Sequence, residues 1–309
     1  MTSILKWFNA LLVGLLVLVS SCGKPQEEQA GITAQIPLRT VYTVNYPLQY
    51  FAQRIAGDKL TVIFPMTVNE DPAFWKPEAH IIQAYQNADL ILLNGANYAK
   101  WLTTAVLPQS KLIDTSKASK DHYIELKDVM THSHGPGGEH EHGNVAFTVW
   151  LDMQIAIKQA EAIAAAFTAR DTANSATYEA NLKTLKKDLV DLDTQLKEIP
   201  KANPETSLIG SHPVYQYLTK AYGLNLEAVH WEPEEMPTEE MWNEFKELLT
   251  KHPAKWLLWE SEPGPEIVAK LKALGINSLT FDPAGATPEK GDWLSVMKTN
   301  AEQLKQAYK

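Results

Sequence analysis

Short apolar runs alternate with amphipathic stretches along most of the chain. Runs rich in Val, Ile, Leu and Tyr at residues 39–45, 60–65 and 89–93 have the length of buried strands. Stretches with helical periodicity, such as 47–55 and 80–87, separate these runs. Because strands and helices alternate, the pattern predicts an α/β fold with a mostly parallel sheet.

The first half also predicts a helix at 98–106 and a short strand at 111–113. The alternation then recurs in the second half, where strands are predicted at 207–210, 226–231, 255–259 and 278–281, each followed by a helix. We therefore expect two similar lobes. Ligands of open α/β sheets bind beyond the carboxyl ends of the strands, so the cleft between the lobes is the expected site.

A long one-sided apolar stripe lies between the two halves. Its members recur at alternating steps of four and three before Pro200: Tyr178, Leu182, Leu185, Leu189, Leu192, Leu196 and Ile199. Such a stripe can form a coiled-coil dimer seam or pack within its own chain. A single stretch flanked by α/β sequence favours the second, a rigid helix at about 176–199 that joins the lobes in a monomer.

The N-terminus has the features of an export signal. Lys6 precedes an apolar run, 7–19, that is too short to span a bilayer, and small residues lead to Cys22. The pattern resembles a bacterial lipobox, which implies cleavage before Cys22 and a lipid on its sulfur. A free thiol behind an ordinary signal peptide is the alternative. We expect a chain anchored through lipid alone, in the periplasm or at the cell surface.

The resulting organisation has five parts. They are a signal peptide at 1–21, a polar lipid-anchored tether at 22–37, an N-terminal lobe at 38–150, a helical region at 151–200 and a C-terminal lobe at 201–309. Within the first lobe, residues 131–143 form a Gly- and His-rich segment with neither helical nor strand period, which predicts a loop.

Composition limits the classes of function. The net charge of −9 and the isoelectric point near 5.5 argue against a nucleic-acid partner. The sequence has no HExxH, no GxSxG and no phosphate-binding Gly loop, and an acylated Cys22 cannot act as a nucleophile. We therefore predict a binding protein rather than an enzyme; a three-ligand zinc site with a free position would be the only opening for catalysis.

Several residues are candidate metal ligands. The 131–143 segment contains His132, His134, His140 and His142, and imidazole suits zinc, copper and nickel. His212 and Asp282 each follow a predicted strand, and Glu260 and His230 lie at neighbouring strand ends. The alternatives are a solvated loop, a helix-capping His212 and an Asp282 that forms a turn.

The chain resembles the substrate-binding proteins of zinc and manganese ABC importers, the ZnuA-like or TroA-like group. Four segments carry this resemblance: Asp71-Pro72-Ala73-Phe74-Trp75-Lys76-Pro77, Val149-Trp150-Leu151-Asp152, His212-Pro213-Val214-Tyr215-Gln216-Tyr217 and Asp282-Pro283. Tyr178 and Asn181 match the start of the linking helix. The resemblance implies a metal between two lobes, with His212 and Asp282 as ligands. The nearby Glu260 and His230 could serve as further ligands or as supporting groups.

The chain departs from the family at two ligand positions. Ala73 and Thr148 stand where the family has its first two histidines. Three interpretations follow. Loop histidines replace the lost pair, which we favour; or the protein scavenges metal mainly on the loop; or the cleft binds a non-metal ligand. For the last, Trp75, Trp150, Trp231 and Trp259 could line an apolar pocket, although core packing is favoured.

The resemblance also implies the partners. We expect a lipoprotein that captures Zn²⁺, with Mn²⁺ and Cu²⁺ as alternatives, and delivers it to a membrane permease driven by a cytoplasmic ATPase. Histidine ligation favours zinc over manganese, which prefers oxygen donors.

Overall fold

A computed structural model describes residues 38–66, 71–126, 131–133, 139–141 and 145–309. The predicted signal peptide, Cys22 and the tether lie outside these residues, as do His134 and His142. No helix in the described part of the chain is both long enough and apolar enough to cross a membrane.

The first sheet has four parallel strands in the order β2-β1-β3-β4. These are β1 (Thr40–Thr43), β2 (Thr61–Ile63), β3 (Leu90–Leu93) and β4 (Leu112–Asp114). The associated helices are α1 (Tyr46–Ala56), α2 (Ala79–Asn87) and α3 (Met153–Arg170). Asn45 caps α1 by accepting a hydrogen bond from Leu48 N, and the proline at position 47 suits the first turn.

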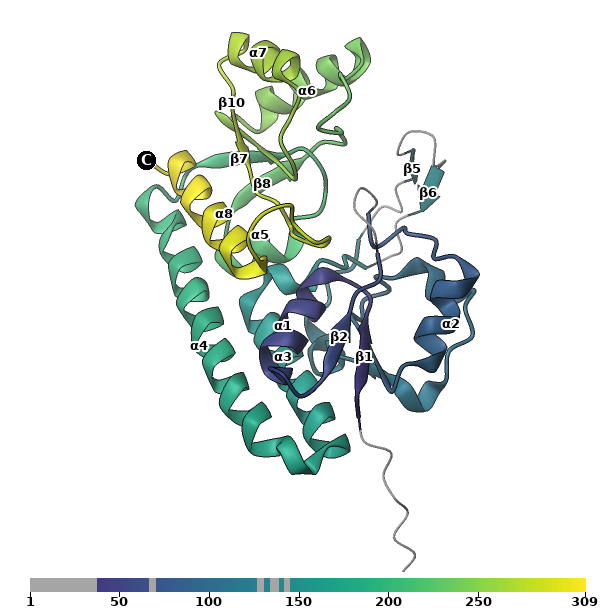
Figure 1. Cartoon of the computed structure of the whole chain (residues 1–309). Helices are drawn as coiled ribbons and strands as arrows, with labels where there is room; N and C mark the ends of the chain where they lie inside the picture. Colours follow the sequence, from purple (N-terminus) through teal and green to yellow (C-terminus); the bar gives the residue numbers. More distant parts are fainter. Residues whose placement is uncertain (1–37, 67–70, 127–130, 134–138, 142–144) are drawn as a thin grey trace, which may run out of the picture. The chain divides into compact units, whose positions relative to one another are not determined.

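The second sheet repeats this arrangement in the order β10-β9-β7-β8, again all parallel. Its strands are β7 (Ser207–Gly210), β8 (Asn225–Ala228), β9 (Trp256–Trp259) and β10 (Asn277–Thr280). Its helices are α5 (Gln216–Tyr222), α6 (Glu239–Lys251), α7 (Pro265–Ala273) and α8 (Trp293–Ala307). The predicted α/β class with two parallel sheets is confirmed (Figure 1).

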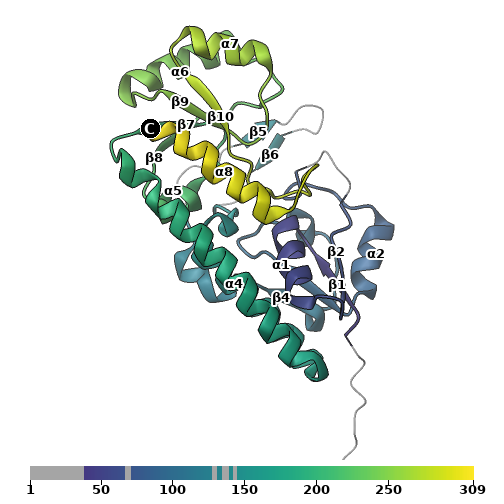
Figure 2. The same ribbon diagram turned by 60° about the vertical axis from the view of Figure 1, so that its left-hand side comes forward.

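The predicted linking helix is α4 (Ser175–Glu198). Its apolar stripe is buried within the same chain, with Leu185, Leu189 and Leu196 fully inaccessible to solvent. The helix packs along α3 and α1 and also contacts α8, so it touches elements of both lobes (Figure 2). The coiled-coil alternative is therefore wrong, because the seam it requires is already covered.

Two local predictions are corrected. The helix expected at 98–106 is only a four-residue 3-10 turn, η1 (Lys100–Thr103). Three residues with positive φ, Gly95 to Asn97, lead into it, and no side chain caps it. The loop expected at 131–143 contains an antiparallel strand pair, β5 (Thr131–Ser133) and β6 (Glu139–Glu141). Gly- and Pro-rich sequence between two short polar segments is also typical of a β-hairpin, which periodicity alone does not reveal.

The remaining regular elements are short 3-10 turns: η2 (Gln109–Lys111), η3 (Lys117–His122), η5 (Val149–Leu151), η6 (Thr172–Asn174) and η7 (Pro200–Ala202).

The four tryptophans considered as a pocket lining pack in the core. Trp150, Trp231 and Trp259 are at most 2% exposed, and Trp75 packs against the main core. Core packing, the alternative favoured from the sequence, therefore describes these four side chains.

Candidate metal centre

The candidate ligands of the second lobe lie at one edge of its sheet. Residue 212 follows β7, 260 follows β9 and 282 follows β10, while the segment 229–232 follows β8. Since all four strands are parallel, their carboxyl ends meet at the same edge. The sequence prediction that His212, Glu260 and Asp282 lie at this edge agrees with the strand order.

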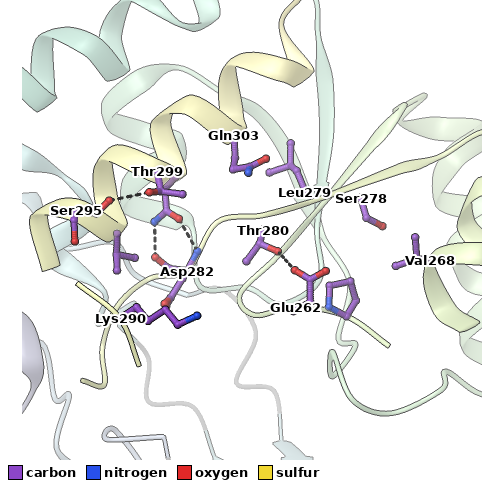
Figure 3. A pocket seen from close by; sticks show the side chains of 13 residues that line it. Glu262, Val268, Ser278, Leu279, Thr280, Asp282, Lys290, Ser295, Thr299 and Gln303 are labelled. Carbon is purple, nitrogen blue, oxygen red and sulfur yellow. Dashed lines mark hydrogen bonds between the residues drawn. The ribbon is translucent and has the colours of Figure 1, made fainter. Parts of the chain in front are cut away.

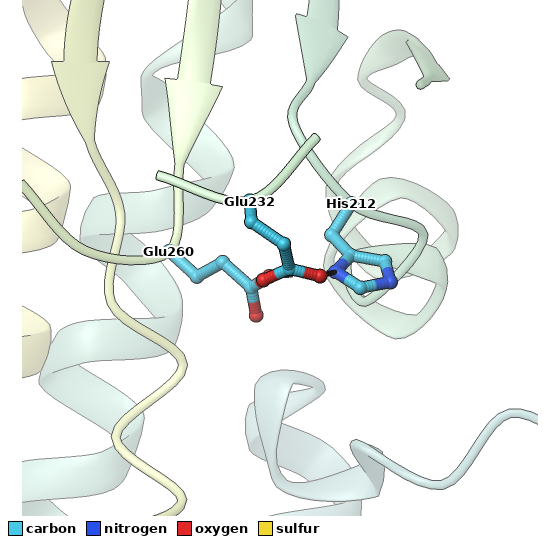
Figure 4. A group of neighbouring side chains, drawn as sticks. All are labelled: His212, Glu232 and Glu260. Atoms are coloured by element: carbon cyan, nitrogen blue, oxygen red, sulfur yellow. Dashed lines mark hydrogen bonds and ion pairs between the residues drawn. The ribbon is translucent and has the colours of Figure 1, made fainter. Parts of the chain in front are cut away.

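Two carboxylates converge on one nitrogen of His212. Its Nδ1 lies 2.9 Å from Oε1 of Glu260 and 3.7 Å from Oε1 of Glu232. One ligand atom from each of the three residues lies within 4.8 Å of the others (Figure 4). The imidazole is 5% exposed, whereas the Glu232 and Glu260 side chains are 31% and 26% exposed. The trio is thus a partly open, negatively charged group that can coordinate a divalent cation.

The loop that carries His212 is held by main-chain hydrogen bonds. Ser211 N donates to Leu258 O of β9 at 2.7 Å, and Ser211 O accepts from Trp231 N at 2.7 Å. Val214 N donates back to His212 O at 2.9 Å, so the chain turns directly after the histidine. These bonds bring the segments with Glu232 and Glu260 against the same loop. The sequence predicted that this strand would end at Trp231, but β8 ends at Ala228. Residues 229–232 therefore lie outside the strand and can pack against the loop that carries His212.

Asp282 lies beside the trio rather than within it. Its Oδ1 accepts from Ala284 N at 2.7 Å, while Asn300 bonds both its main-chain N and O. Burial raises the pKa of the Asp282 carboxyl, and the nearby charge of Glu260 raises it further. The charge of Glu260 therefore acts on the Asp282 carboxylate, but this carboxylate is not one of the groups that lie within 4.8 Å of one another in the trio. His230 stacks edge-on against His212, with ring centroids 5.8 Å apart.

Asp282→Asn is expected to stabilise the metal-free protein at pH 7. The folded pKa is raised above that of an unfolded chain, so the native state binds more protons and stability falls as the pH rises through this window. Asparagine keeps an oxygen for Ala284 N and removes the charge. The Tm at pH 7 should rise by about 1–3 °C. The gain should shrink as the pH falls toward the ordinary pKa of an aspartate; a lower Tm at pH 7 would contradict this account.

The first lobe offers no good metal ligand at the two departed positions. Ala73 is fully buried, and its side chain is a methyl group. Thr148 is 4% exposed, and its hydroxyl donates to Val214 O at 2.6 Å. The hydroxyl is thus engaged with the loop after His212.

The histidines of the 131–143 segment are only partly placed. The backbones of His132 and His140 are opposite each other in the β5–β6 pair, while His134 and His142 lie outside the described residues. That these histidines replace the two family ligands missing at Ala73 and Thr148 stays a prediction.

Sequence reasoning missed Glu232. A signal was available, because this residue directly follows the predicted strand 226–231, in the same relation that Glu260 has to β9.

A separate polar cavity of about 620 Å³ lies between β10 and α8 (Figure 3). Asp282 and Asn300 form part of its wall, and Glu262, Thr280 and Lys290 line it further out. Neither His212 nor Glu232 contributes to it, so this cavity is adjacent to the candidate metal centre and distinct from it.

Comparison with known proteins identifies the family. The family described as "Zinc-uptake complex component A periplasmic", ZnuA, matches residues 41–307. The chain belongs to the ZnuA family. It is 30% identical to the metal ABC transporter substrate-binding lipoprotein FimA of Streptococcus parasanguinis, over 98% of this chain and 96% of FimA. It is 28% identical to the manganese ABC transporter substrate-binding lipoprotein PsaA of Streptococcus pneumoniae, over 98% and 96%.

The solved structures agree on the fold. The Zn(II)-bound ZnuA-like domain of AdcA from Streptococcus pneumoniae superposes with a TM-score of 0.73 at 24% identity, covering 88% of this chain and 98% of that domain. The ZnuA-family chain is thus a substrate-binding lipoprotein of a metal ABC transporter. Because members of this family bind a transported substrate, the prediction that the chain is not an enzyme is confirmed.

Proposed function

We propose that this chain captures a divalent transition-metal ion on His212, Glu232 and Glu260 and delivers it to a membrane permease. The observation that carries the proposal is the approach of two carboxylates to one buried imidazole, at 2.9 and 3.7 Å. Asp282 is the adjacent carboxylate that completes the shell in this proposal. All four of these residues belong to the second lobe. This agrees with the first lobe, where Ala73 and Thr148 replace the two histidines of the family.

Zn²⁺ is the proposed cargo, with Mn²⁺ and Cu²⁺ as alternatives. A site with nitrogen and oxygen donors binds Zn²⁺ more tightly than Mn²⁺. The difference in affinity between the two ions becomes smaller as the share of carboxylate ligands increases. Similar proteins are named for manganese or were solved with Zn(II), which supports a first-row divalent ion without choosing between them. His132, His134, His140 and His142 are proposed as extra imidazole donors that favour Zn²⁺ over Mn²⁺.

The anchor and the partners follow from the family. Lipid on Cys22 would hold the monomeric chain on the outer side of a membrane, in the periplasm or at the cell surface. A permease and its ATPase would then receive the metal. The polar tether at 22–37 gives the binding region reach from the membrane.

Calorimetric titration tests the proposed function. Zn²⁺ and Mn²⁺ are titrated into chain 22–309 carrying Cys22→Ser, and into the same chain lacking residues 131–143. We expect one tight site in both chains, with the deletion weakening Zn²⁺ more than Mn²⁺. Absence of tight binding of Zn²⁺, Mn²⁺ and Cu²⁺ by the complete chain would overturn the proposal.

Glu232→Gln and Glu260→Gln are each expected to weaken Zn²⁺ binding by at least about tenfold. Glutamine keeps the shape of the side chain but replaces the negatively charged carboxylate with a neutral amide, which is a weaker ligand. Glu262→Gln is the matched control. It changes an exposed carboxylate outside the trio that accepts a hydrogen bond from Thr280 at 3.3 Å. If only Glu260→Gln had an effect, Glu260 would orient His212 and Glu232 would not be a ligand.

A further inference from the structure

The segment 146–150 lies between the two lobes and is fixed to both. It is buried throughout, with every residue at most 9% exposed. On the side of the first lobe, Phe147 O accepts from Asn94 Nδ2 at 2.9 Å, and the Phe147 ring packs edge-on against Tyr98. Asn94 follows β3, so this contact attaches the segment to the first sheet.

The alternate residues of this segment bond the second lobe. Ala146 O accepts from the hydroxyl of Tyr217, in α5, at 3.1 Å. Thr148 Oγ1 donates to Val214 O at 2.6 Å, and Trp150 Nε1 donates to Pro283 O at 2.7 Å. Residues 146, 148 and 150 thus each make a hydrogen bond to the second lobe, while Ala146 N and the Trp150 ring also contact the first lobe at Ile124 O and Tyr98.

Two of these bonds end next to candidate ligands. Val214 is two residues beyond His212, and its own N donates to His212 O, so a fixed Val214 carbonyl fixes the turn that carries the imidazole. Pro283 directly follows Asp282. The first lobe therefore acts on both metal-bearing loops through hydrogen bonds to their main chain.

We propose that Thr148 is a positioning residue that holds the His212 loop and closes the two lobes before metal arrives. The inference rests on the proposed metal site for its effect on affinity, although its structural part does not. Metal bound mainly by ligands of the second lobe then enters a site that is already built, and loading leaves the distance between the lobes unchanged.

The arrangement has a physical reason. A metal that bridges two lobes contributes its binding energy to closing them, and a chain with Ala73 and Thr148 at the first-lobe ligand positions loses much of this contribution. Buried hydrogen bonds at 146, 148 and 150 supply the closure instead. Preorganisation of this kind favours affinity because less order has to be created on binding.

The test compares Thr148→Val, which keeps the shape and loses the donor, with Thr148→Ser, which keeps the hydroxyl. Both are made in chain 22–309 with Cys22→Ser, which leaves no native cysteine. Spin labels at Gln83→Cys in α2 and Lys272→Cys in α7, both exposed, report the distance between the lobes by pulsed EPR. Zn²⁺ affinity is measured by calorimetry on the unlabelled variants.

In the parent chain we expect the same distance distribution with and without Zn²⁺. Without metal, Thr148→Val should broaden the distribution while Thr148→Ser keeps it. Thr148→Val should also weaken Zn²⁺ binding by about tenfold, as the loss of one buried hydrogen bond predicts. A parent distance that shortens on adding Zn²⁺, or a Thr148→Val variant equal to Thr148→Ser in distance and affinity, would overturn the inference. The metal-free comparison stands even if the parent chain binds no Zn²⁺.

Discussion

Replacement of His212 by alanine is expected to weaken Zn²⁺ binding by more than about 100-fold, a larger loss than the removal of a supporting residue normally causes. The imidazole is the only nitrogen donor of the trio, and both carboxylates approach its Nδ1. Its removal leaves two partly exposed carboxylates, which bind a transition metal weakly and with little selectivity. Competition with a chelator of known affinity measures the change.

The control for this experiment is His80→Ala. His80 is an exposed histidine of α2 whose Nδ1 lies 3.2 Å from Oε2 of Glu78, and it lies in the other lobe. Its loss should leave Zn²⁺ affinity within a factor of two. Equal losses in both variants would point to non-specific binding by surface histidines, and an unchanged His212→Ala affinity would remove the second-lobe site altogether.

Leu189→Ala is expected to lower the free energy of unfolding by about 2–5 kcal/mol, the usual cost of a cavity left by a buried leucine. Leu189 is fully buried on the stripe of α4, where that helix packs along α1 and α3. Urea unfolding followed by tryptophan fluorescence gives the free energy. Calorimetry on the same variant should show unchanged Zn²⁺ affinity, because Leu189 is a core residue of α4 and is not a member of the trio.

The neighbouring residue provides the matched control. Val190 is 45% exposed, so Val190→Ala removes little buried surface and should cost less than about 1 kcal/mol. If both substitutions had the same effect, the stripe would not be the packed face of α4. A drop in stability that depends on protein concentration for Leu189→Ala would instead point back to a dimer.

The sequence predicted more about the second lobe than about the first. In the second lobe, His212, Glu260 and Asp282 each follow a parallel strand. The short apolar run of a buried strand locates the end of that strand to within a few residues. Their common edge then follows from topology. In the first lobe, the helix expected at 98–106 shrank to a short turn, because three residues in the left-handed region precede it and periodicity carries no information on such backbone geometry.

The sequence by itself determined the α/β class, the long joining helix, the family and the loss of histidine ligands at Ala73 and Thr148, because these depend on local periodicity and on residue identity. Only the tertiary structure decided that Glu232 meets His212, that Asp282 stands outside the trio, and that the Thr148 hydroxyl bonds the loop after His212. The first and last of these facts depend on contacts between residues 20 and 66 positions apart. Such contacts are fixed by how strands order within a sheet and how loops pack, which no local pattern encodes.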